Sequence, residues 1–196
     1  MKHVLTASQT VGPFFHFALN RPEWSDLTAG GAKGEKIRIE GQVLDGDGAP
    51  VFDAFLEIWQ ANAAGKYNHE EDRQDKPVDP NFRGFGRACT DAQGYFRFTT
   101  IKPGAVPGPG NTLQAPHINV SIFARGLLKQ LVTRIYFADE AAANEIDPVL
   151  SSIENPAVRQ TLIAERVGSN GEAGGITTYR FNIVLQGRGE TAFFEL

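Results

Sequence analysis

Residues 114–126 read QAPHINVSIFARG, and this stretch decides how the rest of the chain is interpreted. Pro116 ends a turn and an apolar run follows, which predicts a β-strand. Side chains alternate between the two faces of a strand. One face is then apolar and is expected to be buried: Ile118, Val120, Ile122 and Ala124. The other face carries an imidazole, an amide and a guanidinium: His117, Asn119, Ser121, Phe123 and Arg125.

The polar face of this strand is close to a metal-binding pattern without matching it. A His-x-His pair on a strand would present two imidazoles to one metal ion. Here the second position is Asn119, whose amide is a poor ligand for a transition metal. The strand alone leaves two interpretations open. Either His117 is a hydrogen-bonded structural residue, or the strand belonged to a metal site and has lost a ligand.

Length and composition limit the class of protein. The chain has 196 residues, enough for one domain with a full core, so we expect a single domain over residues 1–196. The net charge of −4 gives no basis for nucleic-acid binding. The single cysteine, Cys89, excludes an intramolecular disulfide and suits a reducing compartment. No signal peptide and no apolar run of about 18 residues is found, so we expect a cytoplasmic protein.

The spacing of strands and turns predicts the fold class. Residues 36–44 alternate between apolar and polar, the DGDG turn follows at 45–48, and a second strand occupies 52–60. Further strands are expected at 91–100, 130–137 and 178–186, and an alanine-rich helical insertion begins at Ala138. We therefore predict an all-β fold, a β-sandwich of mostly antiparallel strands with a short helical insertion.

The N-terminal segment, residues 1–35, is expected to be an arm followed by a loop. Gly12-Pro13 marks a turn, and Phe14, Phe15 and Phe17 follow at once. A segment this aromatic must bury its side chains, either on its own domain or in a partner. The sequence leaves both possibilities open.

Three residues are candidates for holding a redox metal. Residues 61–86 form a polar segment longer than a normal structureless loop, and it contains Tyr67 and His69. A phenolate suits Fe(III), and His117 could add an imidazole. These three residues do not make a convincing site by themselves, and no common hydrolase, metalloprotease or nucleotide-binding motif is present.

Several long motifs carry a family resemblance. LEIWQANAAGKY at 56–67, DPNFRGFGRACTDAQGYFRFTTIKPGAVPG at 79–108 and APHINVSIFARG at 115–126 resemble the intradiol ring-cleaving dioxygenases. The N-terminal SQTVGPFF and the C-terminal LQGRGETAFFEL resemble the alpha chain of the two-chain members, which act on protocatechuate. The resemblance spans nearly the whole chain.

The resemblance implies a β-sandwich and a non-haem Fe(III) site made of two tyrosines and two histidines. Tyr67 and His117 match two of these ligands, whereas Val106 and Asn119 stand where the second tyrosine and second histidine would be. It therefore implies a chain that binds no metal and pairs with a beta chain that holds the iron. The reaction implied is insertion of both atoms of O₂ into protocatechuate, giving 3-carboxy-cis,cis-muconate.

The resemblance also implies that this chain helps to line the substrate pocket. The residues concerned are Gly12, Pro13, Phe14 and Arg125, with Phe14 in place of the commoner tyrosine. Two other hypotheses stay open. The chain could be a self-sufficient homo-oligomeric dioxygenase whose metal is held by Tyr67, His69 and His117, or a non-catalytic β-sandwich that binds a ligand.

Overall fold

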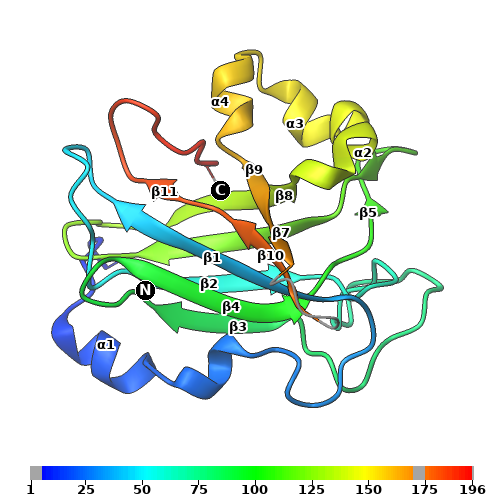
Figure 1. The fold of residues 1–196 in the computed structure, drawn as a ribbon, viewed down its shortest axis with the longest axis horizontal. Coiled ribbons are helices and arrows are strands. Elements are labelled where there is room, and N and C mark those ends of the chain that lie inside the picture. Colours follow the sequence, from blue (N-terminus) through cyan, green and yellow to red (C-terminus); the bar gives the residue numbers. More distant parts are fainter. Residues whose placement is uncertain (1–5, 170–174, 196) are drawn as a thin grey trace, which may run out of the picture.

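The computed structural model describes residues 6–169 and 175–195. The described part of the chain is organised by one large mixed β-sheet, with a short hairpin beside it (Figure 1). The strands of the large sheet are β1 (Lys36–Leu44), β2 (Phe55–Gln60), β3 (Phe85–Cys89), β4 (Tyr95–Ile101), β7 (His117–Phe123), β8 (Leu131–Phe137), β9 (Ile163–Ser169), β10 (Thr177–Arg180) and β11 (Ile183–Val184). The hairpin pairs β5 (Val106–Pro107) with β6 (Leu113–Gln114).

Hydrogen bonding connects the large sheet in the order β11-β1-β10-β9-β8-β7-β2-β3, with β4 paired to β1. Most neighbours are antiparallel. The parallel pairs are β1 with β10, β1 with β11, and β8 with β9. The β8–β9 pair joins the half of the sheet that contains β1 and β4 to the half that contains β2 and β7.

Both halves of the sheet contribute apolar side chains to the same core. Ile39 of β1 and Phe98 of β4 lie in one buried cluster with Ile58 of β2 and Val120 of β7. Burial alternates along β1, as expected for a strand with one face against a core. The prediction of a mostly antiparallel all-β fold is confirmed. The two halves are, however, hydrogen-bonded into one continuous sheet.

The core face of β7 is the one predicted from the sequence. Ile118, Val120, Ile122 and Ala124 are at most 1% exposed and belong to the main core. The opposite face of the strand therefore points away from the core, and its side chains are free to line a site.

Helices follow β8, as the alanine-rich insertion predicts. They are η2 (Ala138–Glu140), α2 (Ala141–Ile146), α3 (Pro148–Ser152) and α4 (Pro156–Gln160). The buried carboxylate of Asp147 accepts hydrogen bonds from the N–H groups of Val149 and Leu150 at the start of α3. It also accepts one from Ala115 at 2.7 Å. Asp147 thus connects the helices to the residues just before β7.

Several elements differ from the sequence-based expectation. The strands β3 and β9 were not predicted. The last strand that the C-terminal sequence TAFFEL also suggested, at 191–196, is reduced in the described residues 191–195 to an isolated bridge between Phe194 and Val132. The N-terminal segment contains a short helix, α1 (Pro13–Leu19), and a 3₁₀ turn, η1 (Pro22–Ser25), where an arm and a loop were expected. The part of the predicted arm before residue 6 lies outside the described residues. No helix within the described ranges has the length and apolarity needed to cross a membrane.

Candidate functional site

Three of the four positions that the resemblance assigns to metal ligands line one pocket. This pocket, here called the Tyr67 pocket, has a volume of about 670 Å³, and Tyr67, Val106 and His117 are part of its wall. The fourth position, Asn119, adjoins the pocket because its Nδ2 donates a hydrogen bond to the Tyr67 hydroxyl at 3.3 Å. Val106 in β5 pairs with Gln114 in β6, three residues before β7 begins. This pairing keeps Val106 close to the start of β7.

Both the backbone and the ring of Tyr67 are held in place. Its N–H donates to Asp72 Oδ2 at 2.8 Å, and its ring stacks on Trp59 with centroids 5.7 Å apart. Burial raises the pKa of Tyr67, and the hydrogen bond from Asn119 opposes this only in part. Tyr67 is therefore a neutral phenol at physiological pH. Its ring has the position of a ligand, but it is not a preformed phenolate.

His117 is a buried, neutral imidazole. The side chain is 3% exposed, and its Nδ1 lies 2.8 Å from the carbonyl oxygen of Ala115. A carbonyl can only accept, so Nδ1 carries the hydrogen and Nε2 keeps its lone pair. Burial, followed by the charge of Arg134, lowers the pKa of His117 to about 4. His117 is therefore a hydrogen-bonded histidine, as the first interpretation of the strand expected, and it lies at a position that the resemblance assigns to a ligand.

Arg134 is the residue in this pocket that the sequence analysis missed. It lies on β8 directly opposite Asn119 of β7 and lines the Tyr67 pocket. Its Nη1 donates to Gln114 Oε1 at 2.6 Å and to the Tyr136 hydroxyl at 3.3 Å. The available signal was a single arginine inside the apolar strand QLVTRIYF, on the face opposite Thr133 and Ile135.

The residues of the Tyr67 pocket do not fit a ferric ion. Val106 has no donor atom, and the amide of Asn119 is used to donate to Tyr67. Arg134 adds a positive charge where a ferric site needs anionic ligands. His69 lines the same pocket, but its Nδ1 accepts the N–H of Glu71 at 3.2 Å on an exposed turn. The hypothesis of a metal held by Tyr67, His69 and His117 therefore has no complete ligand set to support it.

Arg125 lies far from the Tyr67 pocket, although it follows the same strand. The eight residue-to-residue steps from His117 to Arg125 correspond to roughly 26 Å of extended chain at about 3.3 Å per step. Arg125 Nε is 2.5 Å from Asp53 Oδ2, and the guanidinium lies 5.0 Å from the centroid of the Phe52 ring. The Arg125 side chain is 65% exposed. His117 and Arg125, which the sequence pattern placed on one strand face, therefore line two separate hollows.

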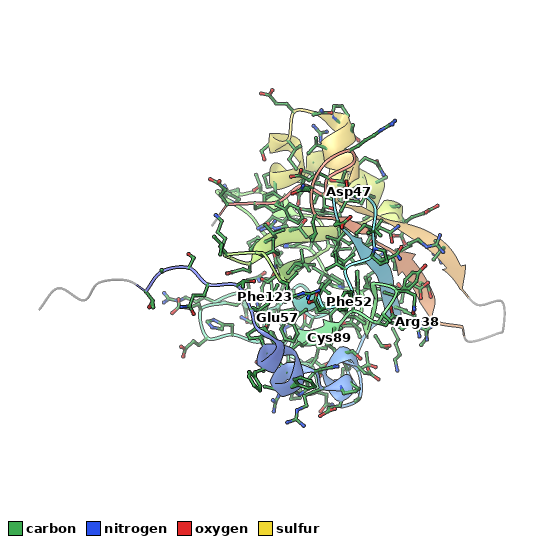
Figure 2. The ribbon with its side chains drawn as sticks, turned by 90° about the vertical axis from the view of Figure 1, so that its left-hand side faces the viewer. Arg38, Asp47, Phe52, Glu57, Cys89 and Phe123 are labelled. Carbon is green, nitrogen blue, oxygen red and sulfur yellow. The ribbon has the colours of Figure 1, made fainter. Side chains whose placement is uncertain are left out.

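The N-terminal segment meets Arg125 in a second hollow, here called the Arg125 groove, of about 380 Å³. Its wall is formed by Val11, Gly12, Phe15, Phe17, Phe52, Asp53, Phe55 and Arg125. Thr10 fastens the segment there, because its Oγ1 accepts the N–H of Gly126 at 2.9 Å and donates to Ala124 O at 3.4 Å. Figure 2 shows Phe123 near the place where this segment reaches the sheet.

Of the four residues expected to line the substrate pocket, the structure brings Gly12 and Arg125 into one groove. Phe14 follows Gly12 by two positions, is 84% exposed and is not part of the groove wall in this chain alone. The side chain of Pro13 lies outside the described part of the structure. Phe15 packs inward, with its ring centroid 5.1 Å from that of Phe55 and 5.7 Å from that of Phe123.

Comparison with solved structures identifies the fold. The 3-chlorocatechol 1,2-dioxygenase of Rhodococcus opacus 1CP matches with a TM-score of 0.63 at 22% identity, over 85% of this chain and 66% of that chain. An intradiol ring-cleavage dioxygenase from Tetranychus urticae matches with a TM-score of 0.63 at 20% identity, over 85% and 86% of the two chains. The chain therefore has the all-β fold of intradiol dioxygenases.

Sequence comparison identifies the family. The family model described as "Dioxygenase" matches residues 12–187. The chain is 45% identical to the protocatechuate 3,4-dioxygenase alpha chain of Pseudomonas putida, over 97% of this chain and 96% of that one. It is 40% identical to the corresponding beta chain of Burkholderia cepacia, over 94% and 77% of the two chains. The chain belongs to the intradiol dioxygenase family, whose members are iron-dependent enzymes.

Proposed function

We propose that this chain is the non-metal alpha chain of a protocatechuate 3,4-dioxygenase and acts only with a beta-type partner. The observation that carries the proposal is the Tyr67 pocket, where Val106 and Asn119 stand at two of the four ligand positions and Arg134 adds a positive charge. The 45% identity to a chain of that name supports the same assignment. The reaction is cleavage of protocatechuate by O₂ to 3-carboxy-cis,cis-muconate, and the partner's ferric ion supplies the activation of substrate toward O₂.

The Arg125 groove is the part of this chain that we propose contributes to the partner's substrate pocket. Phe14 and Phe17 are 84% and 78% exposed, which is unusual for neighbouring large apolar side chains unless a partner covers them. The proposed lining residues are Gly12, Pro13, Phe14 and Arg125. Phe14 has no hydroxyl, so its role is to exclude water and to contact the substrate ring or the partner.

Arg125 is proposed to bind the carboxylate of protocatechuate. A guanidinium is always charged and presents two parallel N–H donors to a carboxylate. Asp53 holds the guanidinium through its Nε, which leaves the two terminal nitrogens available. The Phe52 ring supports its flat face. The arginine is thus already oriented before an anion arrives.

The test of this role is the substrate dependence of Arg125→Ala in the alpha–beta complex. A lost charge-assisted bond of about 1.5–3 kcal/mol corresponds to roughly 10- to 150-fold in kcat/KM for protocatechuate. Catechol has no carboxylate and should be affected much less. Arg97→Ala is the matched control, since Arg97 is 66% exposed and pairs with Glu40 on another strand pair. Equal losses for both substrates, or no loss for either, would refute the role.

Two further parts of the proposal concern organisation and location. We propose that residues 1–196 form one domain, which the shared core of β1, β2, β4 and β7 supports. We also propose a cytoplasmic location, for which the single unpaired cysteine is the supporting observation.

A further inference from the structure

The Tyr67 pocket contains a cation without a carboxylate partner. Two acidic residues in its wall already have cations of their own, because Asp72 pairs with Lys66 at 3.2 Å and Glu71 pairs with Arg73 at 3.7 Å. Arg134 donates to Gln114 and Tyr136, which are both neutral. Among residues 6–169 and 175–195, no carboxylate forms an ion pair with Arg134. Its charge is therefore available to a ligand.

Arg134 is held in a defined position. Gln114, which accepts from Arg134 through Oε1, donates through Nε2 to Pro107 O at 3.0 Å. The Tyr136 hydroxyl accepts from Arg134 and donates to the buried carboxylate of Asp147 at 3.2 Å. Only Nη1 of the guanidinium is used in these bonds, so further N–H groups remain to donate into the pocket. A cation fixed in this way binds an anion at lower entropic cost.

A second donor lies in the same pocket. Asn119 donates to the oxygen of the Tyr67 hydroxyl, so the phenolic hydrogen is left to be donated elsewhere. Within the described part of the chain, no acceptor for this hydrogen is recorded. Burial keeps Tyr67 protonated, as its raised pKa indicates. The guanidinium of Arg134, from β8, and the hydroxyl of Tyr67, from the loop after β2, are thus two donors in one pocket.

Part of the wall is apolar and includes the flat surface of the Trp59 indole. Trp59 is stacked on Tyr67, and Val106 and Pro107 line the same hollow. The volume of about 670 Å³ lies within the range of small-molecule sites. A small inorganic anion would use the donors and leave these walls uncovered.

We propose that the Tyr67 pocket is a binding site for a monocyclic aromatic carboxylate, with Arg134 pairing its carboxylate and Trp59, Val106 and Pro107 contacting its ring. The resemblance places a metal cation in this pocket, whereas we propose that in this chain the pocket binds an anion. The proposal does not rest on the dioxygenase function, since this pocket lies at the far end of β7 from Arg125 and needs no iron.

The test is a titration of the full chain with benzoate, with no partner chain present. The sequence has two tryptophans, so Trp24→Phe makes Trp59 the sole indole reporter. We expect saturable quenching of Trp59 fluorescence, together with a matching heat of binding by calorimetry. Arg134→Gln should weaken benzoate binding about tenfold or more, as expected for loss of a charge-assisted hydrogen bond. The exposed Arg97→Gln should bind as the parent does.

Two further measurements complete the test. Tyr67→Phe keeps the ring stacked on Trp59 and removes the hydroxyl, and it should bind benzoate a few-fold more weakly, so it decides the question if Arg134→Gln does not fold. Inorganic phosphate is the probe for a simple anion site and should bind more weakly than benzoate. The proposal is overturned if benzoate does not bind at tens of millimolar, if both variants bind it unchanged, or if phosphate binds as tightly.

Discussion

At the scale of single residues, the charge of Arg134 opposes metal binding in the Tyr67 pocket, in addition to the two positions, Val106 and Asn119, that provide no suitable ligand. The sequence motif alone suggests that Val106→Tyr with Asn119→His would rebuild part of the site, because Tyr67 and His117 are in place. The guanidinium of Arg134 changes this expectation, since a fixed positive charge in the pocket opposes a ferric ion.

We therefore predict that the double variant Val106→Tyr/Asn119→His binds little iron, and that adding Arg134→Gln increases iron binding. Val106 is 4% exposed and lines the pocket, so a tyrosine there would start from an inward-facing position. Metal analysis and the tyrosinate-to-iron absorption band measure the outcome. If the double variant already binds iron as well as the triple variant, Arg134 has no such effect.

His117 provides a prediction about pH. Its pKa is about 4 in the folded chain and 6.5 when unperturbed, so the unfolded chain binds a proton first as the pH falls. The resulting stability is fully present above pH 6.5 and is lost between about 6.5 and 4, amounting to roughly 3 kcal/mol over the whole window.

His117→Gln should therefore lose less stability than the parent between pH 7 and pH 4.5, measured as the free energy of unfolding in urea. Other groups titrate in both proteins, so the difference between the two pH profiles is the informative quantity. Parallel profiles would show that His117 does not titrate in this window.

The residues predicted from sequence were those that form motifs. Tyr67, Val106, His117 and Asn119 could be aligned with a ligand set, and the structure brings them together. Arg134 was missed because it gains its meaning from lying opposite Asn119 in the β7–β8 register, which one strand cannot show. Arg125 lies two residues beyond the end of β7, so the length of that strand separates it from His117.

At the scale of elements, α1 shows how two adjacent phenylalanines divide their roles. Phe15 packs against Phe55 and Phe123, whereas Phe14 is 84% exposed. We predict that Phe15→Ala lowers the stability of the chain, by less than the ~3–5 kcal/mol of a fully buried phenylalanine. Phe14→Ala should leave stability within about 0.5 kcal/mol and weaken association with the beta-type chain.

Urea unfolding of the chain and sedimentation of the mixed chains measure these two effects separately. The matched pair differs by one position in the same helix, so general effects on α1 are controlled. Equal loss of stability in both variants would contradict the assignment of Phe15 alone to the core. Unchanged association of Phe14→Ala would contradict a partner-facing surface.

The elements that could be predicted are those with a clear period. Alternation in β1 and the apolar run in β7 identified both strands, and β8 and the helical insertion followed from propensity. β3 reads FGRAC at the end of a polar segment and β9 reads IAERVGS, so neither shows a clean alternation. They become strands through pairing with β2 and β10, which is tertiary information.

At the scale of the whole molecule, the chain has the family's fold, but its Tyr67 pocket does not have a complete set of metal ligands. The described part of the chain has the fold of intradiol dioxygenases, while the pocket lined by Tyr67 and His117 contains a valine side chain and the guanidinium of Arg134. The exposed aromatic residues of α1 and the Arg125 groove lie elsewhere on the surface. This arrangement is the basis of our proposal that the chain serves catalysis only with a partner chain that supplies the iron.

The most direct test is to measure iron content and oxygen uptake with protocatechuate for this chain alone and for the chain purified together with a beta-type partner. The account predicts almost no iron and no oxygen uptake for the chain alone. Together, the two chains should contain iron in proportion to the partner and cleave protocatechuate. Near-stoichiometric iron with turnover in the isolated chain would contradict it, and so would a stable pair that binds iron and leaves protocatechuate uncleaved.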